Sequence, residues 1–109
     1  MHHAHTRIKD YLKKQFKLEY SQIETLLPGL LHALAQHMEN MQKALSSGDL
    51  EQLGKAGHTM KGALLNLGLK ECAEIAYEIE LKSRAAEDST DFNHLVVSLQ
   101  EQLAEYLTD

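Results

Sequence analysis

The stretch from Gly54 to Gly68 contains the residues of this chain that are best suited to chemistry. His58 is the first of them, because an imidazole with a pKa of about 6.5 is largely unprotonated and nucleophilic at neutral pH. Such a nitrogen can attack phosphorus and hold the group in a labile P–N bond. Lys61 follows three residues later on the same side of a helix, where its ammonium can offer charge to phosphoryl oxygens. The pair therefore suits covalent phosphoryl transfer.

Helical periodicity separates a core side from a solvent side in a helix predicted from Leu50 to Leu67. The apolar side consists of Leu53, Ala56, Met60, Ala63, Leu64 and Leu67. The opposite side carries Glu51, Gly54, Lys55, Lys61, Gly62 and Leu65 around His58. We therefore predict that His58 faces solvent. We also expect Lys55 and the apolar Leu65 to contact a docking partner. An ordinary surface leucine is the alternative for Leu65, but its place beside His58 suits a docking contact.

Three glycines inside this helix need an explanation, since each destabilises a helix by about 1 kcal/mol relative to alanine. Gly54 and Gly62 lie one turn before and one turn after His58, and we predict that they leave the imidazole accessible. Close packing of two helices is the alternative. It suits Gly57, but it fits Gly54 and Gly62 poorly because they point away from the predicted core.

A nucleophilic imidazole also needs its second nitrogen fixed by a hydrogen bond, which sets the tautomer. The predicted hairpin turns near Leu69, and His58 and Glu80 each lie eleven residues from that turn. The two side chains should therefore be at the same height on neighbouring helices. Glu80 can then accept a hydrogen bond from Nδ1 and leave Nε2 to attack, or it can be a solvated carboxylate.

Apolar residues recur every three or four positions through most of the chain, which predicts amphipathic helices. A capping box at Ser21 and Glu24 begins the longest helix, and Pro28 inside it predicts a kink or two abutting helices. Gly48 ends this helix and Asp49 caps the next. The predicted helices are Thr6 to Lys17, Ser21 to about Ser47, Leu50 to Leu67, Lys70 to Ala86 and Phe92 to about Leu107.

Four long helices with short connections predict an all-α fold, an antiparallel up-down-up-down four-helix bundle. We expect the short additional N-terminal helix to cap one end. The 109 residues leave room for one domain, with residues 1–20 as N-terminal tail and capping helix and residues 21–109 as the bundle. His2, His3 and His5 are either native or left from a tag, so they do not enter the fold prediction.

Composition excludes several classes of function. The net charge of −5 argues against nucleic acid as a partner. The apolar runs are too short to span a membrane, and the N-terminus lacks the apolar segment of a signal peptide. The single cysteine, Cys72, suits the reducing cytoplasm. The first seventeen residues are basic, and we interpret them as a solvated helix face in preference to a patch for an acidic partner.

The sequence around His58 resembles the signature of histidine-containing phosphotransfer (HPt) domains. The matching segment is Ala56-Gly57-His58-Thr59-Met60-Lys61-Gly62-Ala63-Leu64-Leu65-Asn66-Leu67-Gly68, a histidine followed by Lys-Gly and a later Gly. Residues 44–50 resemble the pattern that precedes the active helix, and Ile79-Glu80 stands where the family has Leu-Glu or Leu-Gln. The resemblance extends from about Leu27 onward. Small departures are Met60 for a usual Leu and Ala63-Leu64 for smaller residues.

The resemblance implies a phosphocarrier in a two-component phosphorelay, without kinase or hydrolase activity of its own. His58 would accept the phosphoryl group from a receiver-domain aspartate and pass it to another receiver. Lys61 would stabilise the phosphoryl group, Gly62 would give clearance, and Glu80 matches the position that holds the other histidine nitrogen. The implied partners are response-regulator receiver domains or a hybrid histidine kinase. No cofactor is expected, because Mg²⁺ belongs to the partner receiver.

Rival functions fit the sequence less well. A di-metal bundle needs Glu-x-x-His motifs, and the chain has only Asp91-x-x-His94, while His32 and His37 are badly spaced for one helix face. No nucleophile elbow or phosphate-binding loop supports a hydrolase.

A docking module that binds a receiver without accepting phosphate is the main alternative, and the presence of His58 argues against it. The initiating Met and compact length favour a free-standing protein, which we expect to be a monomer.

Overall fold

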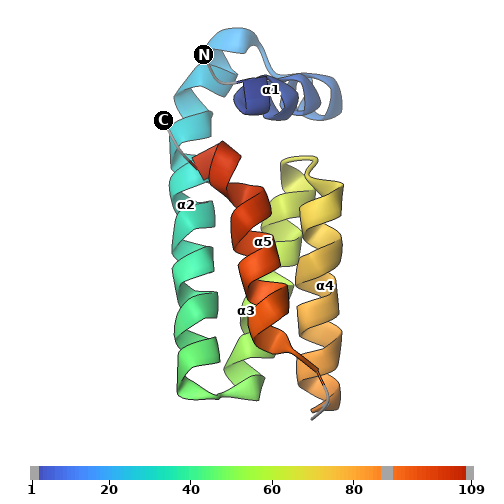
Figure 1. Ribbon diagram of the computed structural model, residues 1–109. Helices are drawn as coiled ribbons and strands as arrows, with labels where there is room; N and C mark the ends of the chain where they lie inside the picture. Colours follow the sequence, from blue (N-terminus) through green and yellow to red (C-terminus); the bar gives the residue numbers. More distant parts are fainter. Residues whose placement is uncertain (1–2, 87–89, 108–109) are drawn as a thin grey trace.

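The computed structural model describes residues 3–86 and 90–107, and the regular structure in these ranges is entirely helical (Figure 1). The five helices are α1 (His3–Phe16), α2 (Tyr20–Ser47), α3 (Leu50–Asn66), α4 (Lys70–Ala85) and α5 (Phe92–Leu107). The predicted all-α class is confirmed for the described residues. Every predicted helix is present, and the largest shift of an end is at α1, which begins at His3 and not at Thr6.

Helices α2 to α5 lie side by side, and α1 lies across one end of them (Figure 1). α3 packs most extensively on α4 and next on α2. Gly54 of α3 lies against Ser83 of α4. Three residues later Gly57 lies against Ala76, so α3 and α4 run in opposite directions. The molecule is elongated, with extents of 46 × 24 × 18 Å.

The start of α2 differs from the prediction. Glu19 is the N-cap residue, and its backbone N–H donates to Oε1 of Gln22 at 2.8 Å. Ser21 lies within the first turn, where its carbonyl accepts from Oγ1 of Thr25 at 3.0 Å. The predicted capping box at Ser21 and Glu24 is therefore wrong by two residues. Glu19 and Gln22 have the same spacing, and they provide the cap.

α2 runs as one helix from Tyr20 to Ser47, with Pro28 inside it. Proline cannot donate the backbone hydrogen bond at its own position, which weakens the helix there. Leu27 and Leu34 are buried before and after it. This packing on the core holds the helix together through the proline, so the two separate helices that we considered are not formed.

The turn between α2 and α3 has the predicted stop and cap. Gly48 adopts a left-handed conformation with φ of 70°, which glycine accepts without steric cost, and it ends α2. Oδ1 of Asp49 then accepts from the backbone N–H of Gln52 at 3.1 Å and caps α3. The cap fixes where α3 begins and so helps to fix the position of His58 two turns later.

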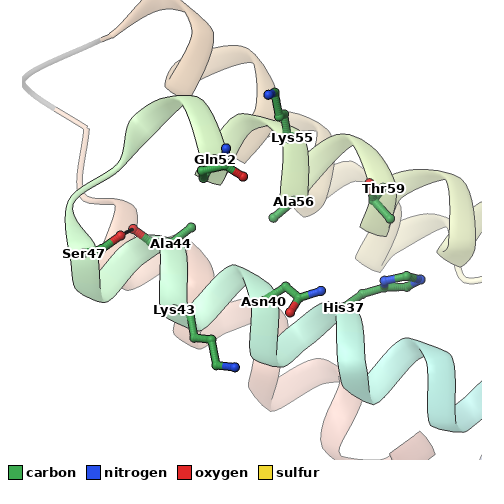
Figure 2. A pocket seen from close by; sticks show the side chains of 9 residues that line it. All are labelled: His37, Asn40, Lys43, Ala44, Ser47, Gln52, Lys55, Ala56 and Thr59. Atoms are coloured by element: carbon green, nitrogen blue, oxygen red, sulfur yellow. Dashed lines mark hydrogen bonds between the residues drawn. The ribbon is translucent and has the colours of Figure 1, made fainter.

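A polar groove runs between α2 and the first half of α3 (Figure 2). Its lining residues are His37, Asn40, Lys43, Ala44, Ser47, Gln52, Lys55, Ala56 and Thr59. Two lysines and no carboxylate are among them, so this surface is basic although the chain has a net charge of −5. The side of α3 that faces α2 is thus partly open.

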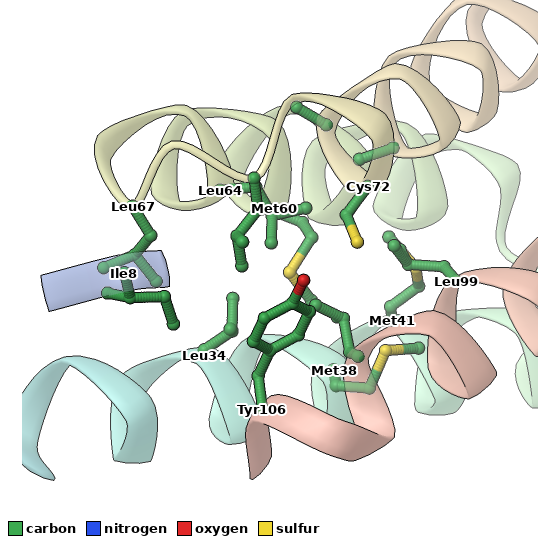
Figure 3. Packing of buried hydrophobic residues seen from close by; sticks show 14 of the residues in the cluster. Ile8, Leu34, Met38, Met41, Met60, Leu64, Leu67, Cys72, Leu99 and Tyr106 are labelled. Atoms are coloured by element: carbon green, nitrogen blue, oxygen red, sulfur yellow. The ribbon is translucent and has the colours of Figure 1, made fainter. Parts of the chain in front are cut away.

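The core contains apolar side chains from all five helices (Figure 3). Those of α3 are the ones predicted for its core side, since Leu53, Met60 and Leu64 are almost completely buried. Ala56 and Ala63 are half-buried against the same cluster. Burial of this side leaves the opposite side of α3, which carries His58, at the surface.

α1 is fixed to the end of the bundle by apolar and polar contacts. Ile8 and Leu12 are buried in the core. Arg7 forms an ion pair of 2.8 Å with Glu71 at the start of α4, and Lys9 pairs with Glu24 of α2 at 2.6 Å. α1 therefore covers one end of the bundle (Figure 1). His2 lies outside the described residues.

Candidate functional site

His58 lies on the surface of α3, where 61% of its side chain is exposed. Its Nδ1 is 2.9 Å from Oε2 of Glu80, which lies on α4. The equal spacing of the two residues around Leu69 left this contact and a solvated carboxylate as alternatives, and the structure has the contact. A carboxylate accepts, so Nδ1–H is the donor, and Nε2 keeps its lone pair. The imidazole is therefore held by one nitrogen, and the other is free to react.

Glu80 is the buried centre of the site, with only 4% of its side chain exposed. Three cationic or polar groups converge on its carboxylate. Oε2 accepts from Nδ1 of His58 and lies 3.1 Å from Nη2 of Arg84, and Oε1 lies 3.1 Å from Nζ of Lys61. Burial by itself would raise the pKa of Glu80. The close contact with Lys61 and the hydrogen bond from His58, with the charges of Lys61 and Arg84, outweigh burial and hold that pKa below its ordinary value.

Lys61 is held against α4. Besides its contact with Glu80, its Nζ lies 4.5 Å from the centroid of the Tyr77 ring, a cation–π geometry. Only 25% of the lysine side chain is exposed. The ammonium is therefore localised on the α4 side of His58. Its three N–H donors are not all used by one carboxylate oxygen, so it can also donate to an oxyanion.

The glycines of α3 differ in their surroundings. A Cβ added at Gly62 would meet no atom of the described chain within 4 Å apart from the neighbouring backbone of its own helix, so this position is open. A Cβ at Gly57 would lie 3.0 Å from the Ala76 carbonyl oxygen and from the Glu80 nitrogen, which shows the predicted close packing. Gly54 is also buried, with Ser83 and Arg84 at 3.5 Å from such a Cβ.

The predicted location of Gly54 on the open surface is therefore wrong. Gly54 and Gly62 are eight residues apart, which places them about 80° apart around the helix, on opposite sides of His58. α4 covers the side of Gly54 and Gly57. Gly54 consequently permits contact between α3 and α4, and it does not uncover the imidazole.

The exposed histidine, its buried carboxylate and the neighbouring lysine are an arrangement that suits phosphoryl chemistry. The model of the Hpt domain family matches residues 25–109. The chain belongs to the Hpt domain family. No curated protein and no solved structure matches it significantly. Membership gives this protein a phosphotransfer role in two-component signalling, since Hpt domains are phosphocarrier modules that interact with receiver domains or histidine kinases.

The two residues predicted to dock a partner lie on the exposed side of this Hpt domain. Leu65 is one further turn along α3 from Lys61 and is 46% exposed. Nζ of Lys55 is exposed and lies 3.4 Å from Oε1 of Glu51, a pair that water screens strongly. Both side chains are therefore available to another molecule next to His58.

Two residues of the site were not predicted from the sequence. Tyr77 and Arg84 lie three residues before and four residues after Glu80, so all three share one face of α4. That spacing was a usable signal once Glu80 was placed opposite His58. The pairing of Lys61 with Glu80 was missed as well, because spacing along α3 alone does not show which side of His58 α4 covers.

Two further observations on the Hpt domain concern membrane spans and metal sites. In the described part of the chain, no helix has both the length and the apolar character that crossing a membrane requires. Within the same residues, His, Cys, Asp and Glu side chains do not gather in groups of three or more that could hold a metal ion.

Proposed function

We propose that His58 is the phosphoacceptor of a phosphorelay, and that it takes a phosphoryl group from the aspartate of one receiver domain and gives it to another. The observation that carries this proposal is the 2.9 Å contact between Nδ1 of His58 and the buried Glu80. It orients an exposed imidazole and, in the neutral ring, places the proton on Nδ1 so that the lone pair of Nε2 is available. The protein acts as a carrier in this role, with no kinase or hydrolase activity of its own.

In the transfer step, the lone pair of Nε2 attacks the phosphorus of the receiver's aspartyl phosphate. A P–Nε2 bond forms while the P–O bond to the aspartate breaks, and the carboxylate leaves with the bonding electron pair. Nδ1 keeps its proton throughout. The positive charge that develops on the ring therefore lies beside the carboxylate of Glu80, which stabilises it. Transfer to the second receiver is the same step in reverse.

Lys61 supports this step electrostatically. Its ammonium is held on the same side of α3 as Glu80, with N–H donors left to interact with the phosphoryl oxygens. The Mg²⁺ that neutralises the receiver's aspartyl phosphate belongs to the receiver, and this chain needs no cofactor in the proposed role. Partners are response-regulator receiver domains or a hybrid histidine kinase, and the free thiol of Cys72 supports a cytoplasmic location.

The up-down-up-down topology predicted for α2 to α5 suits this role. Opposite directions of α3 and α4 bring His58 and Glu80 to one height, so one carboxylate can serve residues of the neighbouring helix. The proposed docking face surrounds His58 and includes Lys55, the open position Gly62 and the exposed Leu65. Removal of exposed leucine surface is favourable on binding, so Leu65 supports a protein partner.

Phosphotransfer to the purified protein tests the proposed function. Phosphorylated receiver domains from the same genome serve as donors, and intact mass is the readout. We expect an acid-labile mass increase of one phosphoryl group on the wild type and none on His58→Gln. His94→Gln, which removes an exposed histidine of α5, is the matched control and should be phosphorylated normally.

Two results would overturn the proposal. One is equal labelling of the wild type and His58→Gln. The other is no labelling by any receiver or by phosphoramidate, a small donor that needs no docking surface. In the second case, binding of a receiver without transfer would indicate a docking module.

The docking face has a separate test. Leu65→Asp should raise the KM for a phosphorylated receiver and leave labelling by phosphoramidate unchanged. Val97→Asp is the matched control, because Val97 is a similarly exposed apolar residue on α5. An equal KM for the wild type and Leu65→Asp would exclude Leu65 from the docking face.

A further inference from the structure

Tyr77 is an exposed aromatic residue of α4 that contacts the phosphotransfer site. It lies one turn before Glu80, and 45% of it is exposed. Its ring centroid is 4.5 Å from Nζ of Lys61. The same ammonium is 3.1 Å from Oε1 of Glu80. α4 thus offers Lys61 two contacts, one from a carboxylate and one from an aromatic face.

The contact with Glu80 alone does not fix the lysine well. The carboxylate is shared with His58 and Arg84, and a lysine side chain is long and has many rotamers. The aromatic face adds a second attraction from a different direction. A ring face also leaves N–H donors of the ammonium free, whereas a second carboxylate would occupy them.

We propose that Tyr77 is a positioning residue for phosphotransfer, which acts by holding the Lys61 ammonium beside His58. This inference rests on the proposed function of His58. The tyrosine hydroxyl has no part in it, because the attraction comes from the ring face. Phenylalanine should therefore replace Tyr77, and an aliphatic residue of similar size should not.

A direct contact between the exposed ring and the receiver is the competing explanation. A double substitution separates the two, because a residue that acts through Lys61 has no effect once Lys61 is removed. Loss of a docking contact would instead persist in a Lys61→Met background. Docking contacts also change KM, whereas placement of the ammonium changes the rate at saturating donor.

The kinetic experiment compares Tyr77→Leu and Tyr77→Phe with the wild type in transfer from a phosphorylated receiver. We expect Tyr77→Leu to lower the rate at saturating donor by about two- to fivefold, the effect of one exposed cation–π contact. Tyr77→Phe should match the wild type. Leu81→Ala, which removes an exposed apolar side chain from the next turn of α4, is the control and should have no effect.

The same substitution in a Lys61→Met background then shows whether Tyr77 acts through Lys61 or by direct contact with the receiver. We expect Tyr77→Leu to have no further effect there. Full rates for Tyr77→Leu, equal losses for Leu and Phe, or an undiminished loss in the Lys61→Met background would each overturn the role of Tyr77.

A spectroscopic readout follows the lysine independently of any donor. Protons next to Nζ of Lys61 lie over the ring, so their NMR resonances should be shifted upfield in the wild type and Tyr77→Phe. The shift should disappear in Tyr77→Leu, and its absence from the wild type would overturn the contact itself. A wild type that takes up no phosphoryl group refutes the proposed function and the role in transfer together. A functional wild type with an unaffected Tyr77→Leu refutes Tyr77 alone.

Discussion

Gly54 and Gly62 lie one turn before and one turn after His58 in the same helix, yet α4 covers the first, and the second is open to solvent. The covered side also carries Gly57 and Lys61, and it faces the buried Glu80. Contacts with α4 on this side hold the His58 imidazole and the Lys61 side chain in place. The open side leaves room for a partner. Accessibility and positioning are therefore supplied by different sides of α3.

A large side chain at Gly54 should damage the fold. Gly54→Leu would extend beyond the Cβ position that is already 3.5 Å from Ser83 and Arg84. Overpacking of this kind costs about 1–3 kcal/mol, and we expect a loss of stability of that size in urea denaturation. An unchanged free energy of unfolding would show that α4 does not pack against the Gly54 side of α3.

The same substitution at Gly62 should spare the fold and impair function. Among the described residues, the Cβ of Gly62→Leu would meet only the neighbouring backbone of its own helix, so stability should be unchanged or higher. The added side chain occupies the proposed docking face, and we expect transfer from a receiver to slow by about tenfold, equivalent to about 1.4 kcal/mol. Phosphoramidate, being small, should label the variant normally. Normal transfer from the receiver would remove Gly62 from the docking face.

Gly57 offers a finer test of how closely α3 approaches α4. Alanine is favoured over glycine in a helix by about 1 kcal/mol, but a Cβ at Gly57 would lie 3.0 Å from two backbone atoms of α4. We expect Gly57→Ala to lower the free energy of unfolding by about 1 kcal/mol after this gain. Gly62→Ala is the matched control and should stabilise the protein. Equal stabilisation by Gly57→Ala and Gly62→Ala would contradict the close approach of α3 to α4.

The smallest expected effect is the change in stability with pH that comes from the charge of Glu80. Its pKa is lower in the folded protein than the ordinary value of about 4.3, so the unfolded state binds the proton more readily. The resulting stability is present above about pH 4.3 and is lost as the pH falls through the lowered pKa. Glu80→Gln should reduce the loss of stability on acidification in this range, measured by thermal denaturation. Glu74→Gln, on an exposed part of α4, is the control and should keep the wild-type profile.

The sequence was sufficient for much of the fold because helices have local signals. Gly48 and Asp49 terminate and cap helices through their own backbone and side-chain chemistry. The buried side of α3 follows from its 3.6-residue period, and equal distances from Leu69 placed Glu80 beside His58. The capping box of α2 was misplaced because two residue pairs have the same spacing.

The location of Gly54 and the partners of Lys61 could not be obtained in the same way. A helical wheel separates the average core side from the solvent side, but it does not show which flank of His58 the next helix covers. Gly54 and Gly62 are symmetrical about His58 on such a wheel. Only the packing of α4 makes one buried and the other open, and it also brings Tyr77 and Glu80 to Lys61.

Identification of the phosphorylated nitrogen shows whether the imidazole reacts through the atom that Glu80 leaves free. After transfer from a phosphorylated receiver to ¹⁵N-labelled protein, NMR coupling between ³¹P and ¹⁵N identifies the bonded atom. We expect phosphorus on Nε2 of His58, with Nδ1 still protonated and donating to Glu80. Phosphorus on Nδ1, or on a different residue, would contradict the arrangement in which Glu80 holds one nitrogen so that the other can react.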